Sequence, residues 1–121
     1  MILVAVDDLL FSSKIRATAK QAGVELTFAR SQAEILEQAR MLKPSLAIFD
    51  LNSGKTNPIE TIAAMKKDPA LVGIPALGFV SHVDASTIEA ARRAGADEIM
   101  ARSTFAGNLA EILSTDRTTK P

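Results

Sequence analysis

The chain of 121 residues contains no cysteine, no tryptophan and no tyrosine, and all of its aromatic residues are phenylalanine. The absence of cysteine excludes disulfides, thiolate metal ligands and cysteine nucleophiles, and it agrees with a cytoplasmic location. Without tyrosine or tryptophan, the chain lacks the usual side chains on which nucleic-acid bases stack. Composition therefore excludes thiol chemistry and disfavours binding to single-stranded nucleic acid.

Neither sign of charge is in excess, because 14 Lys and Arg balance 14 Asp and Glu. This balance favours neither a nucleic acid nor an anionic membrane as a partner. The apolar runs, such as 2–6, are far shorter than the roughly 20 residues that cross a bilayer. With 47% hydrophobic residues, we expect one domain at 1–114, no signal peptide and no membrane span, followed by a polar, disordered tail at 115–121.

Short β-rich runs alternate with longer segments of helical periodicity along the chain. The predicted strands are 2–6, 24–28, 45–50, 75–80 and 97–101. Strict alternation with short connections predicts a parallel sheet with helices on both faces. The predicted fold class is α/β, a flavodoxin-like (βα)5 doubly wound sheet with strand order 2-1-3-4-5. Its topological switch, where ligands collect, lies between the first and third strands.

Apolar residues at helical spacing predict the inward faces of three helices. These residues are Phe11, Ile15, Ala19 and Ala22, then Ile35, Leu36, Ala39 and Leu42, and finally Phe105, Leu109, Ile112 and Leu113. The spacing of capping boxes occurs at 31–34 and 86–89, and Asn57 with Pro58 predicts another helix start. Gly23 and Gly95 stand where helix-ending glycines belong.

Polar side chains follow the predicted strands at the edge of the sheet where the strands end. They are Asp7, Asp8, Asp50, Ser81, His82 and Arg102. Asp50 ends an otherwise apolar strand, where an ionised carboxylate is costly unless it reaches solvent or a cation. Three converging acids favour a hard divalent cation such as Mg²⁺, beside which one carboxylate can attack a phosphoryl group. The alternative interpretation is that these acids cap helices and solvate loops.

With this edge defined, the sequence resembles the CheY-like receiver domains of bacterial two-component response regulators. The resemblance covers about residues 1–114, and the order and spacing of its motifs carry it. The motifs are 2–8 with its acid pair, Asp50 with Asn52, Asp68-Pro69 with Ile74-Pro75, and Ala94-Gly95-Ala96.

The resemblance implies a role for each site residue. Asp7 and Asp8 would hold Mg²⁺ together with Asp50 and the backbone carbonyl of Asn52, and Asp50 would accept phosphate from a kinase histidine. Arg102 would replace the family's lysine, and Ser81 would supply its hydroxyl. The implied partners are a sensor histidine kinase or phosphotransfer protein and a downstream protein or output domain, with a weak homodimer as a further option. The implied role is signalling rather than enzymatic catalysis.

Several positions depart from the receiver pattern. Val80 falls where the family carries a hydroxyl, and the one-residue offset of Ser81 threatens to point its side chain the wrong way unless the loop shifts. Ile99 replaces an aromatic residue, so we expect weak switching through the fourth helix, fifth strand and fifth helix. Arg102 and Ser103 replace a Lys-Pro pair. Two hypotheses follow: a phosphorylatable receiver, and a degenerate receiver that acts as a phosphorylation-independent interaction module.

Other functional interpretations are weaker. The triplet 54–56 has the letters that end a P-loop, but the leading glycine would have to be Phe49. Lys55 is then a solvated loop residue or a counter-charge for the acids, and the lone His82 is a solvated loop residue. The loop after the first strand lacks the His and Gly of a cobalamin-binding domain. The sequence leaves open whether the domain stands alone or belongs to a longer regulator.

Overall fold

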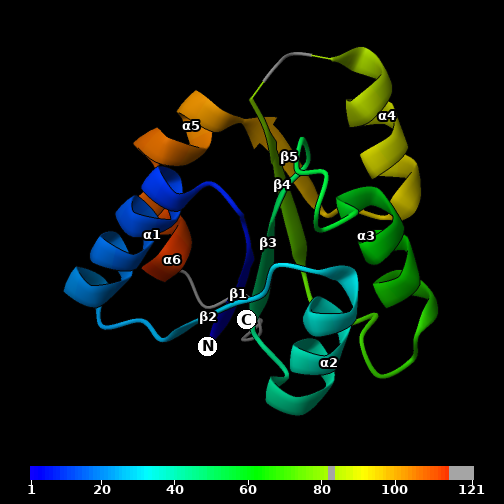
Figure 1. Ribbon diagram of the computed structural model, residues 1–121, viewed down its shortest axis with the longest axis horizontal. Coiled ribbons are helices and arrows are strands. Elements are labelled where there is room, and N and C mark those ends of the chain that lie inside the picture. The colour runs from blue at the N-terminus through cyan, green and yellow to red at the C-terminus, as the bar shows by residue number, and fades with distance from the viewer. Residues whose placement is uncertain (82–83, 115–121) are drawn as a thin grey trace, which may run out of the picture.

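The computed structural model describes residues 1–81 and 84–114, in which strands and helices alternate (Figure 1). The strands are β1 (Ile2–Ala5), β2 (Leu26–Phe28), β3 (Leu46–Asp50), β4 (Ala76–Val80) and β5 (Glu98–Ala101). They pair in parallel in the order β2-β1-β3-β4-β5, which confirms the predicted fold class and strand order. Each strand is one or two residues shorter than predicted, because β1 ends one residue earlier and the other strands begin one or two residues later.

The helices cover both faces of this sheet. They are α1 (Leu9–Ala22), α2 (Gln32–Leu42), α3 (Pro58–Lys67), α4 (Ala85–Ala94), α5 (Arg102–Gly107) and α6 (Leu109–Ser114). The last predicted helix is therefore two short helices. The break falls at Asn108, whose backbone and side-chain N–H groups both donate to the carbonyl of Thr104. Such local bonds compete with continuation of a helix.

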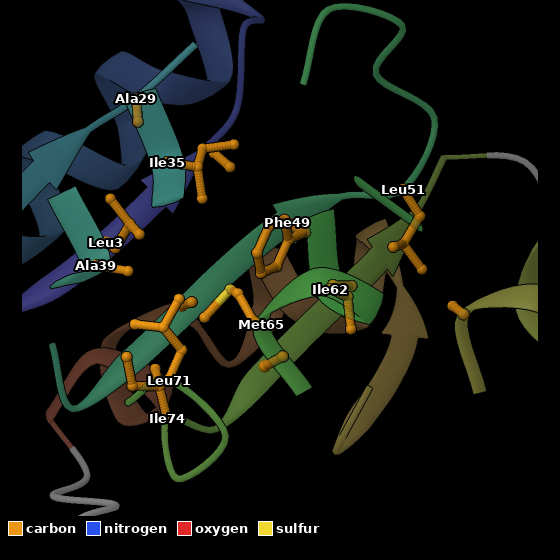
Figure 2. Close-up of a cluster of buried hydrophobic side chains, with 14 of the residues drawn as sticks. Leu3, Ala29, Ile35, Ala39, Phe49, Leu51, Ile62, Met65, Leu71 and Ile74 are labelled. Carbon is orange, nitrogen blue, oxygen red and sulfur yellow. The ribbon is translucent and has the colours of Figure 1, made fainter. Parts of the chain in front are cut away.

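The sheet separates two hydrophobic clusters, as alternation along the strands requires. Helices α1, α5 and α6 pack on one face, and α2, α3 and α4 pack on the other (Figure 1). In β1, Leu3 faces the α2–α3–α4 side and Val4 faces the α1–α5–α6 side. Figure 2 shows the cluster on the α2–α3–α4 side, with Phe49 of β3 beside Met65 of α3. β1, β3 and β4 are buried along their length because both of their faces are covered.

Two helix-end predictions are confirmed by the structure. The Ser31 hydroxyl accepts the Glu34 N–H at 3.2 Å, and the Glu34 carboxylate accepts the Arg30 N–H at 2.7 Å. Gly23 and Gly95 end α1 and α4 with φ of +71° and +107°. That region of backbone space favours glycine because a side chain is strained there.

The other helix-end predictions have mixed outcomes. The second capping box does not form, because α4 begins at Ala85 and Asp84 caps it by accepting the Ser86 N–H at 3.0 Å. The helix start predicted at Asn57 and Pro58 is confirmed, because α3 begins at Pro58, although Asn57 caps it without a side-chain hydrogen bond. Of the inward faces, Ala22 and Leu42 lie exposed in the last turns of α1 and α2.

Two of the sequence predictions concern residues outside the ranges that the structure describes. His82 and the tail at 115–121 lie outside the described residues. No helix in 1–81 or 84–114 has the length and apolar character that crossing a membrane requires.

Candidate functional site

Asp50 is the buried acid of the site and the last residue of β3. Its residue surface is only 7% exposed, and one of its carboxylate oxygens accepts the Asn52 N–H at 2.9 Å. Burial raises the pKa of the Asp50 carboxyl because the charged form loses hydration. The negative charges of Asp7 and Asp8 raise this pKa further, whereas Arg102 and the Asn52 N–H lower it. A positive charge close to Asp50 would therefore stabilise the ionised form of its carboxyl.

Asp7 lies in the turn between β1 and α1 and is tied to the loop after β3. Its Oδ2 accepts the Ser53 hydroxyl at 3.0 Å, and the Ser53 Oγ accepts the Thr56 N–H at 3.4 Å. Ser53 is buried. Sequence reasoning missed Ser53, although its place three residues after the strand-end acid was a signal that its hydroxyl reaches the site.

Asp8 has a contact for each of its carboxylate oxygens. Oδ1 accepts the Phe11 N–H at 3.1 Å and thereby caps α1, and Oδ2 pairs with Arg102 Nη2 at 3.1 Å. These two contacts, with the Phe11 N–H as the larger cause, hold the pKa of Asp8 below its ordinary value. The alternative interpretation, in which an acid of this edge caps a helix, is thus correct for Asp8, and the ion pair is present as well.

Arg102, the first residue of α5, lies over an aromatic side chain. Its guanidinium carbon is 4.3 Å from the centroid of the Phe11 ring, a cation–π contact. Phe11 in turn packs edge-on against Phe79 and Phe105, with centroid separations of 5.3 and 5.7 Å. Sequence reasoning placed Phe11 in the core, which is correct, but periodicity alone does not reveal that its outer face supports a cation.

Ser81 is the residue that follows β4. Asp50 pairs with Phe79 across β3 and β4, and Phe79 belongs to the cluster on the α1 side. Val80 belongs to the opposite cluster, with Leu51. Val80 therefore packs in the core, whereas the Ser81 hydroxyl lies next to Arg102, another predicted site residue.

Two contacts fix Ser81 at this place. Its backbone N–H donates to the side-chain Oδ1 of Asn52 at 2.7 Å, which joins the loops after β3 and β4. Its hydroxyl oxygen is 3.5 Å from Arg102 Nη1, a long contact. Asn52 therefore positions Ser81 through its side chain, a contact that sequence reasoning did not predict.

Two other residues considered from the sequence lie away from these contacts. Lys55 is exposed and makes no hydrogen bond or ion pair within the described ranges, so the structure favours the solvated-loop interpretation over the counter-charge. Ile99 of β5 is partly buried against the α2–α3–α4 cluster.

The acids at this edge are oxygen donors of the type that a hard cation takes. Carboxylates and a backbone carbonyl are the oxygen ligands that Mg²⁺ takes alongside several waters. Asp50, whose pKa is raised by burial and by two neighbouring acids, supplies the uncompensated charge. Within 1–81 and 84–114, no three His, Cys, Asp or Glu side chains are gathered closely enough to hold a metal by themselves. A cation here would thus need ligands other than these side chains.

Comparison with known proteins places this geometry in a structural context. No family model matches the chain. No curated protein matches its sequence.

Many solved structures do match the fold. A response regulator from Hahella chejuensis is 23% identical with a TM-score of 0.85, and the match covers 98% of each chain. The phosphorylated cyanobacterial phytochrome response regulator RcpA is 21% identical with a TM-score of 0.75, covering 93% of this chain and 87% of RcpA. The Mn²⁺-bound response regulator Rcp1 is 19% identical with a TM-score of 0.70, covering 93% of this chain and 88% of Rcp1. The chain therefore has the fold of response regulator receiver domains.

Proposed function

We propose that the chain is a receiver domain of a two-component phosphorelay that accepts a phosphoryl group on Asp50. The observation that carries this proposal is the environment of Asp50. It is a buried carboxylate at the switch point, beside two acids, with a raised pKa and an arginine near enough to oppose that rise. Perturbed acids at such crevices are characteristic of functional sites.

The chemistry needs an oxygen nucleophile and neutralisation of charge on the transferred group. A carboxylate oxygen of Asp50 would form the bond to phosphorus while the bond from phosphorus to the donor nitrogen breaks, so that the donor leaves with its electron pair. Mg²⁺, held by Asp7, Asp8, Asp50 and the Asn52 carbonyl, would neutralise charge on the phosphoryl oxygens. The response regulator Rcp1, which is similar in structure, binds Mn²⁺, and this supports a divalent cation as part of the proposal.

Two further residues serve the phosphoryl oxygens in this proposal. Arg102 offers a planar fork of N–H donors suited to phosphate, and Ser81 offers a hydroxyl beside Arg102. The partners we propose are a histidine kinase or phosphotransfer protein, which supplies the phosphoryl group, and a downstream protein that reads the result. RcpA, which is similar in structure, is a phosphorylated response regulator, and this supports phosphorylation as part of the proposal. Cytoplasmic location is part of the proposal and agrees with the absence of cysteine.

The test is incubation with phosphoramidate and Mg²⁺, followed by intact mass measurement. We expect a gain of one phosphoryl group that is lost on alkaline treatment, as an acyl phosphate requires. Asp50→Asn should abolish the gain. The matched control is Asp68→Asn, because Asp68 pairs with Arg40 away from the site. A gain that persists in Asp50→Asn would refute the assignment.

A second candidate function is a phosphorylation-independent interaction module. The observation that favours it is the ion pair of Asp8 with Arg102, which already neutralises one of the acids. Ile99, which stands in place of an aromatic residue, also favours the interaction module. Absence of any mass gain in a folded wild-type protein would establish this second candidate over the first.

A further inference from the structure

The strand β2 forms one edge of the sheet and leaves part of its backbone open. The Glu25 carbonyl accepts the Ile2 N–H, so the backbone of Glu25 points to β1. Backbone groups of successive strand residues point to opposite sides of the strand. Leu26 and Phe28 therefore turn their N–H and C=O groups to the open edge, where no other strand of 1–81 or 84–114 pairs with them. An edge of this kind can pair with an extended chain.

The side chains of the segment 24–28 line a groove beside this edge. Val24, Leu26 and Phe28 alternate onto the face of the sheet that α1 covers, and each is only partly buried. Together with Ala19 of α1, they line a groove of about 320 Å³. The groove thus offers an apolar surface for side chains directly next to an open strand edge.

Two basic side chains of α1 flank this groove. Arg16 and Lys20 belong to its lining, and both are exposed. The Arg16 guanidinium carbon lies 4.6 Å from the centroid of the Phe28 ring, a cation–π contact that holds the charge over the apolar surface. Neither side chain makes a hydrogen bond or ion pair with another residue of 1–81 or 84–114, and α1 contains no acid. The two charges are therefore available to the carboxylates of a partner.

We propose that the groove between α1 and β2 binds an extended, acidic segment of a partner protein. The segment adds as a further strand along the backbone of Leu26 and Phe28. Its apolar side chains enter the groove, and acids two positions away on the same face reach Arg16 and Lys20. This inference goes beyond the proposed function, because none of the residues that line the groove belongs to the Asp50 site.

Charge decides between this partner and other occupants of the groove. A second copy of the chain, paired edge to edge through β2, would bring its own Arg16 and Lys20 against the same two cations. Like charges in close contact are unfavourable. The tail at 115–121 has one acidic and two basic residues and no large hydrophobic side chain. It therefore lacks both the charge and the apolar surface that would match the groove.

The experiment measures binding of a short fluorescein-labelled peptide to the full chain by fluorescence anisotropy at low ionic strength. In the peptide, threonine fills every second position, and valine and glutamate alternate at the positions between, so that apolar and acidic side chains share one face. The double variant Arg16→Gln with Lys20→Gln should bind it about fivefold more weakly than the wild type, the size of two exposed ion pairs. Lys67→Gln with Arg93→Gln is the matched control, because it removes the same charge from exposed positions on α3 and α4.

Methylation of the peptide backbone tests the strand edge separately from the charges. The N–H groups of an added strand point alternately to β2 and to solvent. N-methyl groups on one alternate set should therefore abolish binding, and those on the other set should leave it unchanged. Equal binding by both methylated peptides would overturn addition at the β2 edge.

The remaining outcomes concern the occupant of the groove. No binding of the peptide to the folded wild type would overturn the inference. Equal weakening in both double variants would overturn it too, because loss of net positive charge would then account for the change. In sedimentation of the chain without peptide, a dimer that strengthens in the Arg16 and Lys20 double variant would assign the groove to a second copy instead. The mass measurement on Asp50 is independent of all these results, so the proposed function stands or fails separately.

Discussion

Gly78 in β4 is a position where one added methyl group should destabilise the fold, because the group would meet the residue that follows Asp50. A Cβ placed at Gly78 would lie 2.7 Å from Leu51 Cδ1 and 2.8 Å from its Cγ and Cδ2. Carbon atoms in contact are normally about 3.5–4.0 Å apart, so the added Cβ would lie about 1 Å too close to Leu51. Leu51 is buried and follows Asp50 directly, so it has little room to move. We expect Gly78→Ala to lower the free energy of unfolding by about 1–3 kcal/mol.

A double-mutant cycle tests whether Leu51 is the cause. Leu51→Ala alone should cost about 2–5 kcal/mol through lost burial, but it removes the side chain that the methyl group added at Gly78 would meet. The double variant should therefore be at least about 1 kcal/mol more stable than the sum of the two single changes predicts. Urea unfolding followed by circular dichroism provides the measurement. Additive effects would refute the reasoning. Gly107→Ala is the control, because nothing lies within 4 Å of its added Cβ.

Two further predictions concern charged groups. Because the pKa of Asp50 is raised, the folded state binds its proton more tightly, so stability from this group falls as pH rises through that pKa. Asp50→Asn should therefore be more stable than the wild type at neutral pH, with the difference vanishing in acid; equal urea midpoints at neutral pH would contradict this. Lys66 donates to the carbonyls of Val72 and Ile74 and to Asp97, so Lys66→Met should lose about 1–3 kcal/mol in urea unfolding. The exposed Lys67→Met should change little, and similar losses in both would count against the network.

The fold could be predicted from the sequence because the same hydrophobic patterns repeat along the chain. Each strand is a short apolar run and each helix carries an apolar stripe, so alternation predicts a parallel sheet and narrows its strand order. The strand-end position of Asp50 follows from the same pattern.

The contacts of the site were less accessible because they join residues far apart in the chain. The sequence placed Val80 at the end of a strand, and β4 does end there, but the contact of the Ser81 hydroxyl with Arg102 joins residues 21 positions apart. The ion pair of Arg102 with Asp8 spans 94 residues, and no local pattern encodes such a pair. Ser53 was missed for the same reason, since its partner Asp7 lies 46 residues away.

The position of Arg102 over the Phe11 ring has a spectroscopic consequence. Protons held above an aromatic face are shielded by the ring current, so the guanidinium-side methylene protons of Arg102 should resonate upfield of those of exposed arginines. The chain has no tryptophan or tyrosine to provide a fluorescence signal. This shielding therefore gives the protein an intrinsic reporter, because its loss in a proton spectrum would show that the Arg102 side chain no longer covers the ring.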